Sequence, residues 1–154
     1  MSNKIKLNIL INKKNPVQVS DDFFYKVSEL VFEQINYPLS EAEISLLLTN
    51  SEEIKILNKN FRDKDYPTDV LSFPMNDECL EDSILGDIVI NLDKVEEYSK
   101  ENDIPYEREL AFLYIHGLLH LLGYDHEINE EEEKIMFDLQ EDILKKAINQ
   151  GVCG

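Results

Sequence analysis

Hydrophobic residues form two kinds of pattern along this chain. In some stretches they alternate with polar residues or form short apolar runs, which predicts β-strands. In others they recur every three or four residues, which predicts amphipathic α-helices. The expected strands are 4–12, 42–49, 70–75 and 84–91. The expected helices are one through residues 24–35, for which Ser20 and Asp21 offer caps, a short one that opens after Asn50 and runs through Phe61, and 92–101, 105–122 and about 130–149.

The order of these elements predicts the fold class. Residues 70–75 and 84–91 resemble a β-hairpin, which argues against a purely parallel sheet. A length of 154 residues without repeats or a low-complexity linker predicts one domain. We therefore expect a single α+β domain in which a mixed four-stranded β-sheet packs with about five α-helices.

Single residues predict where elements begin or bend. Asn50, with Glu53 three residues later, resembles a capping box, and Asn129 is a candidate cap for the last helix. Gly86 within a strand indicates a bulge or a close backbone approach. The apolar run at residues 45–48 predicts a strand buried on both faces.

All three histidines lie in the most apolar stretch, "HGLLHLLGYDH" at 116–126. His116 and His120 are four residues apart, so they project from the same face of a helix. Gly123 can end that helix, and the turn after it can bring His126 back to the pair. Three neutral imidazole nitrogens and one open position form the pattern of a catalytic zinc site. Without a metal, two buried imidazoles side by side would be costly polar groups.

The histidine spacing also matches that of a metalloprotease motif. In those proteases a glutamate follows the first histidine and activates the water on the metal. Gly117 occupies that position in this chain, which argues against peptide hydrolysis by that route.

Three blocks of the sequence resemble the YbeY family of bacterial ribosomal RNA maturation factors, which are zinc-dependent, single-strand-specific endoribonucleases. The first block is "LNKNFRDKDYPTDVLSFP" at 57–74, the second is "LGDIVI" at 85–90, and the third is the histidine stretch at 116–126. They occur in the family's order.

The resemblance implies an α+β fold with a zincin-like metal-binding helix. It implies that His116, His120 and His126 bind one zinc ion per chain, although another divalent metal could replace zinc. Arg62 and His116 are the implied catalytic residues. The implied role is processing of the 3′ end of 16S rRNA, ribosome assembly and ribosome quality control. The implied partners are the rRNA precursor and the ribosome or its assembly proteins.

The charge distribution bears on how RNA would be held. A net charge of −17 argues against binding of nucleic acid by bulk electrostatics, and we expect neither DNA nor a membrane as a partner. Residues 54–64 are nevertheless basic and include Arg62, whose planar guanidinium can donate two hydrogen bonds to a phosphate. Only two cysteines, Cys79 and Cys153, occur, and they suit a reduced cytoplasmic protein.

Several alternatives stay open at this point. Arg62 could be a solvated surface residue, and Thr68 and Asp69 could be ordinary turn residues. Asp125 could accept a hydrogen bond from a ligand imidazole or only form a turn. No general base is identifiable. The rival functions are a peptidase with an unusual base and a non-enzymatic ribosome-assembly factor whose metal holds a helix end together.

Overall fold

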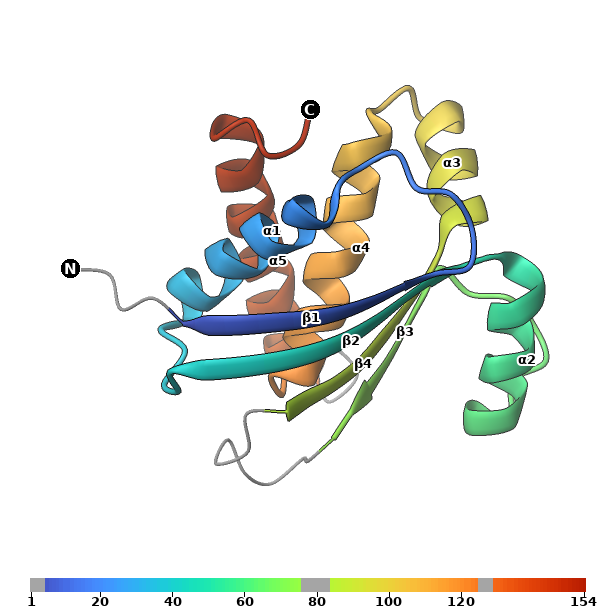
Figure 1. The fold of residues 1–154 in the computed structure, drawn as a ribbon, viewed down its shortest axis with the longest axis horizontal. Helices are drawn as coiled ribbons and strands as arrows, with labels where there is room; N and C mark the ends of the chain where they lie inside the picture. The colour runs from blue at the N-terminus through green and yellow to red at the C-terminus, as the bar shows by residue number, and fades with distance from the viewer. Residues whose placement is uncertain (1–4, 76–83, 125–128) are drawn as a thin grey trace.

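The computed structural model describes residues 5–75, 84–124 and 129–154, and the predicted order of strands and helices is confirmed. Figure 1 shows the arrangement. The elements are β1 (Lys6–Lys13), α1 (Asp21–Ile35), β2 (Glu41–Thr49), α2 (Ser51–Arg62), β3 (Val70–Pro74), β4 (Ile84–Asn91), α3 (Leu92–Glu101), α4 (Tyr106–Leu121) and α5 (Glu130–Asn149).

The sheet is mixed, as the sequence predicts. Its strand order is β1-β2-β4-β3, with β1, β2 and β4 parallel and β3 antiparallel to β4. Strand β3 therefore forms one edge of the sheet. The predicted α+β class with four strands and five helices is confirmed within the described residues.

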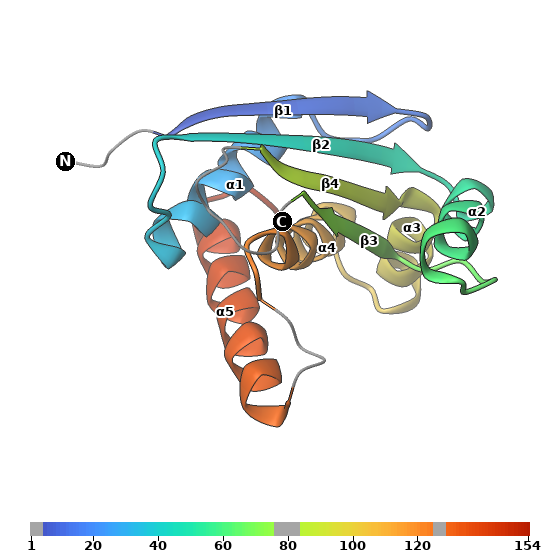
Figure 2. The ribbon, with the colours of Figure 1, turned by 90° about the horizontal axis from the view of Figure 1, so that it is seen from below.

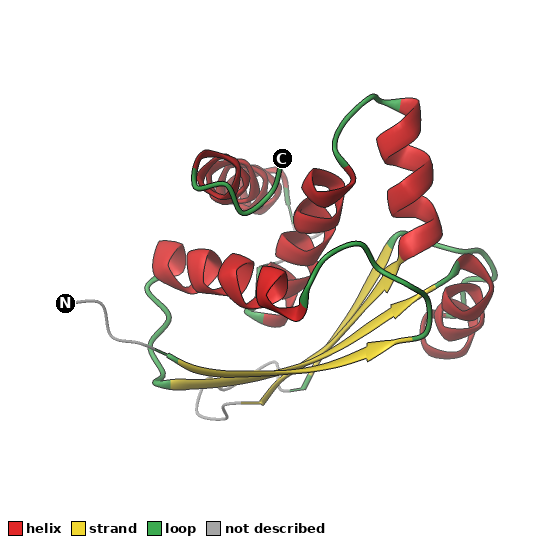
Figure 3. Ribbon diagram, turned by 45° about the horizontal axis from the view of Figure 1, so that its top comes forward, coloured by secondary structure: helices red, strands yellow, loops and turns green. Residues whose placement is uncertain are grey.

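Most helices pack on one face of the sheet. Helices α1, α4 and α5 lie on that side in Figures 2 and 3, and α4 runs next to the sheet. Side chains of this layer, such as Phe24, Val31 and Leu118, form the main core with Ile44 and Ile88 of the sheet. Burial of these apolar surfaces supplies the main driving force for folding.

The opposite face of the sheet is only partly covered. Helix α2 packs there on a small cluster that contains Ile54, Leu71 and Val89. Ser45 and Leu47 of β2 are only half-buried on this face, so the prediction of burial on both faces over residues 45–48 is wrong. The apolar run predicted a strand buried on both faces, but α2 covers only one end of the sheet (Figure 3).

Gly86 shows both features that the sequence indicated. The register between β2 and β4 shifts beside it, since Glu43 pairs with Ile84 and Ile44 pairs with Gly86. Its φ is +137°, and a Cβ atom there would lie 2.3 Å from the carbonyl oxygen of Phe73. Only glycine permits this conformation and this close approach.

The predicted helix caps are present at Asn50 and Asn129. Each side chain accepts a hydrogen bond from the backbone N–H three residues later, at 2.9 Å and 2.8 Å. Ser20 precedes α1 but makes no side-chain cap. No helix among residues 5–75, 84–124 and 129–154 is long and apolar enough to cross a membrane.

Candidate metal centre and RNA-binding residues

The helix that carries the histidines is buried along most of its length. Helix α4 begins after Pro105, and eight of its hydrophobic residues are buried, together with Gly117 and Glu109. Gly123 has φ +98°, and its N–H donates to the carbonyl oxygen of His120 at 3.1 Å. This glycine follows the helix end as predicted, three residues after the second histidine.

The structure brings His116 and His120 together. Their Nε2 atoms are 3.1 Å apart, and their ring centroids are 4.6 Å apart with an interplanar angle of 73°. Two nitrogens bound to one tetrahedral zinc ion, at about 2.0–2.1 Å each, lie about 3.3 Å from one another. The spacing and the donor type of this pair therefore fit a zinc ion.

The third predicted ligand, His126, lies outside the described residues, as does Asp125. Within the described part of the chain, no group of three or more His, Cys, Asp or Glu side chains is placed to hold a metal. The described residues thus contribute two imidazoles, and a third ligand from His126 stays a prediction.

Gly117 lies on the side of α4 that faces the sheet. A Cβ atom at this position would lie 2.9 Å from Cγ2 of Ile88 and 3.3 Å from Oγ of Ser72. The same Ser72 hydroxyl donates to the carbonyl oxygen of Gly117 at 3.2 Å. A glutamate would therefore collide with β3 and β4. This is a further argument against a metalloprotease that uses a glutamate at this position.

Arg62 is exposed at the last position of α2. Asp63 follows it in a left-handed conformation and caps the helix, since the N–H of Asp63 donates to the carbonyl oxygen of Lys59. The structure does not place α2 and the histidine helix on the same face of the sheet. Phe73 of β3 contacts Phe61 of α2, whereas Ser72 contacts α4, so the edge strand lies between the two (Figure 1).

Buried asparagines hold the connection from Arg62 to β3. Asn58 donates to the carbonyl oxygen of Tyr66 at 2.9 Å, and Asn91 donates to that of Thr68 at 3.1 Å. The backbone N–H of Asn91 also donates to the backbone carbonyl oxygen of Asp69 at 2.9 Å. These bonds hold the connection that follows Arg62 and tie it to Asn91 at the end of β4.

The comparisons with known proteins agree with the three sequence blocks. The model of the family described as endoribonuclease YbeY matches residues 9–148. The endoribonuclease YbeY of Sulfurihydrogenibium sp. is 43% identical over 149 residues, covering 95% of this chain and 97% of that protein. That of Oceanobacillus iheyensis is 48% identical over 138 residues, covering 82% and 88%. The chain belongs to the endoribonuclease YbeY family.

A solved structure supports the fold. The solution structure of TM1509 from Thermotoga maritima is 32% identical, with a TM-score of 0.65, and covers 94% of this chain and 90% of that one. The family resemblance inferred from the sequence is thus confirmed over nearly the whole chain.

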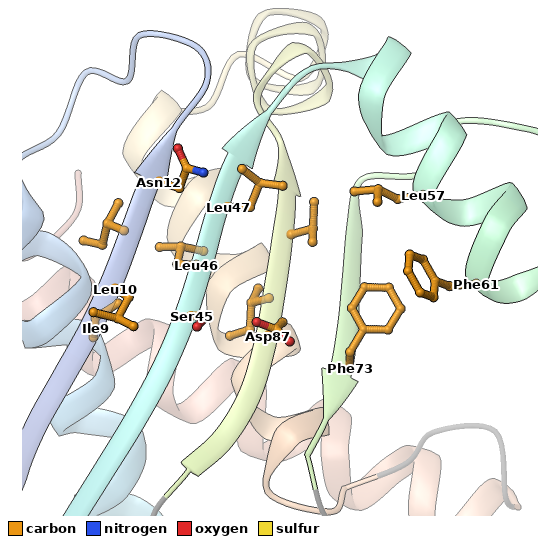
Figure 4. A pocket seen from close by; sticks show the side chains of 13 residues that line it. Ile9, Leu10, Asn12, Ser45, Leu46, Leu47, Leu57, Phe61, Phe73 and Asp87 are labelled. Carbon is orange, nitrogen blue, oxygen red and sulfur yellow. The ribbon is translucent and has the colours of Figure 1, made fainter.

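The uncovered face of the sheet in this YbeY family member forms a hollow of about 860 Å³ (Figure 4). Phe61 and Phe73 line one side, with ring centroids 5.4 Å apart, and Phe61 is 68% exposed. Ser45 and Asp87 supply polar groups on the floor. Arg62 follows Phe61 directly, so a basic helix end adjoins this apolar surface.

Two buried polar residues, one on α4 and one on α5, have no counterpart in the sequence predictions. Gln140 of α5 contacts His116, with Oε1 2.9 Å from Nδ1. Glu109 precedes His116 by seven residues, or about two turns of α4, and is buried. The sequence signal that could have revealed them is a polar residue at a core position of a predicted helix. Gln140 follows Met136 by four residues, and Glu109 adjoins Leu110.

Replacement of Glu109 by glutamine is expected to stabilise the protein at alkaline pH. Burial, and secondarily the negative charge of Asp69, raises the pKa of Glu109 from 4.5 to about 7. The folded protein therefore holds this proton more tightly than the unfolded chain does. The resulting stability is complete below about pH 4.5 and is lost as the pH rises through about 7.

Thermal unfolding of Glu109→Gln and wild type at pH 4.5, 6 and 8 checks this expectation. The advantage of the variant should grow with pH, because a glutamine cannot ionise. Glu107→Gln, which removes an exposed carboxylate from the same turn of α4, is the control. A difference in Tm between Glu109→Gln and wild type that stays constant with pH would contradict the assignment.

Proposed function

We propose that this protein is a zinc-dependent, single-strand-specific endoribonuclease that matures the 3′ end of 16S rRNA and acts in ribosome assembly and quality control. Hydrolysis of RNA phosphodiester bonds is the activity of the family to which the chain belongs. The observation that carries the metal-dependent part is the pair of histidine Nε2 atoms 3.1 Å apart on a buried helix.

In this proposal, His116, His120 and His126 hold one zinc ion. When bound, zinc acts as a Lewis acid that stabilises negative charge on phosphoryl oxygens. His116 would thereby contribute to catalysis as a ligand. The two described imidazoles are partly buried, so they hold the metal position at the protein surface, where a polymer can reach it.

Arg62 is proposed to bind an RNA phosphate through two parallel hydrogen bonds. A guanidinium fork matches the geometry of two phosphate oxygens. Because β3 lies between α2 and α4 and forms the edge of the sheet, an RNA strand would have to pass around this edge to reach both elements. A single strand can bend in this way more easily than a stiff duplex.

The charge of the chain supports recruitment to the ribosome by a partner. With a net charge of −17, long-range repulsion opposes the encounter with naked RNA. A ribosomal or assembly protein would bring the enzyme to its precursor and overcome this repulsion. We place this activity in the cytoplasm, without a membrane or DNA partner.

Cleavage of a precursor fragment from the 3′ end of 16S rRNA tests the proposal. Zinc-loaded protein is incubated with the single-stranded fragment, the same fragment annealed to its complement, and a peptide substrate. We expect cleavage of the single strand only, with a rate that falls as salt rises from about 50 to 200 mM. Equal cleavage of the duplex would refute strand specificity. Peptide cleavage beside intact RNA would refute the proposed activity.

A further inference from the structure

Gln140 is a polar residue at a core position of α5. It lies on the buried face of the helix with Met136, Ile143 and Ala147, and only 5% of its surface is exposed. Burying an amide is unfavourable unless its polar atoms form hydrogen bonds. An apolar side chain would be more favourable at this buried position. The hydrogen-bond partner of the amide therefore indicates the role of Gln140.

That partner is the imidazole of His116, on a different helix. The Oε1 atom of Gln140 lies 2.9 Å from Nδ1 of His116. A carbonyl oxygen can only accept, so Nδ1 carries the proton and donates. In the neutral ring, Nε2 then has the lone pair. Nε2 is the atom that lies 3.1 Å from Nε2 of His120.

We propose that Gln140 is a positioning residue for the metal centre, which fixes the tautomer and the ring orientation of His116 so that the Nε2 lone pair points at the metal position. The inference rests on the metal site of the proposed function. Metal-binding histidines commonly donate their other ring N–H to a carboxylate or carbonyl group, and loss of that acceptor typically weakens metal affinity 10–100-fold.

The neutral amide also suits this position. It orients the ring without adding the formal charge that a carboxylate would bring into the packed layer between α4 and α5. Met136 and Ile143 are almost fully buried in that layer. The contact further ties the histidine helix to α5, at a point 24 residues away along the chain. Helix α5 thus supplies an orienting group to a site whose described histidines both lie on α4.

Two variants of Gln140 and one control test the proposal. Gln140→Met has a similar length and removes the acceptor, whereas Gln140→Glu keeps an acceptor oxygen at the same reach. Ile143→Val is the control, because it loosens the same face of α5 without changing a hydrogen bond. Zinc affinity is measured by competition with a chromogenic chelator. The tautomer of His116 is read from the ¹⁵N chemical shifts of its ring in metal-free protein.

We expect Gln140→Met to fold, to bind zinc 10–100-fold more weakly, and to lose the preference for the Nδ1–H tautomer. Gln140→Glu should retain that tautomer and most of the affinity, and Ile143→Val should match wild type in both measurements. Unchanged zinc affinity in Gln140→Met, an equal loss in Ile143→Val, or an Nε2–H tautomer in the wild type would each overturn the proposal.

These readouts separate the proposal from the proposed function. Protein that binds zinc with the expected dependence on Gln140 but leaves RNA intact would overturn the endoribonuclease assignment and support the positioning role. Wild-type protein without affinity for zinc would overturn the metal site and the positioning role together. RNA cleavage in that protein would show that the activity is independent of both.

Discussion

Replacement of Arg62 by alanine is expected to slow RNA cleavage by about 10²–10³-fold, equivalent to about 2.7–4 kcal/mol. In the proposed function, the guanidinium donates to phosphate from the exposed end of α2. Arg62→Lys should recover only part of the rate, because an ammonium group is a point charge and not a planar fork. Arg62→Glu should be slower than the alanine variant, since it also repels phosphate.

Zinc content and Tm should stay unchanged in these variants, because Arg62 is exposed. Lys59→Ala is the matched control: it removes one positive charge from the same exposed end of α2. Separate measurement of kcat and KM shows which RNA phosphate Arg62 contacts. A fall in kcat indicates contact with the transferring phosphate, and a rise in KM indicates contact with a neighbouring one. Wild-type kinetics in Arg62→Ala would reduce this arginine to a surface residue.

The elements of the fold were predictable because local signals agree with the tertiary structure. Asn50 and Asn129 cap the helices that their positions predict. Gly86 is required by a backbone contact within the predicted pair of strands. Where spacing, caps and glycines all agree, the sequence specifies an element nearly to the residue.

Features that depend on the arrangement of elements were not predictable in the same way. The apolar run in β2 does not tell which face α2 leaves uncovered, so Ser45 and Leu47 were expected to be buried. Ile135 follows the helical spacing of the apolar residues of α5, which predicts burial, but it is 46% exposed. Its helix begins beyond the packed layer, as the protruding end of α5 in Figure 2 shows.

The candidate site also contains both local features and features that depend on how the elements pack. The histidine pair follows from spacing on one helix, a local property that the sequence contains. The contact of His116 with Gln140 joins α4 and α5, and it depends on how those helices pack. The separation of Arg62 from the histidines by β3 likewise follows from the sheet order. Sequence thus identifies ligands more readily than it identifies the groups that orient them.

Replacement of His120 by alanine is expected to remove bound zinc and to abolish RNA cleavage. The wild type should carry about one zinc ion per chain. His120 supplies one of the two Nε2 atoms that lie 3.1 Å apart, and the remaining imidazoles cannot complete the ligand set. Elemental analysis and cleavage of the precursor fragment measure the two effects on the same preparation.

Leu122→Ala is the control, because it removes a half-buried side chain from the same helix end and no ligand. It should retain zinc and activity, with at most a lower Tm. The comparison also decides between the proposed function and a metal that only holds the helix end together. In the second case, His120→Ala would lose zinc and stability, while the zinc-loaded wild type would leave RNA intact. Full zinc occupancy in a variant that lacks all three histidines would place the metal elsewhere in the chain.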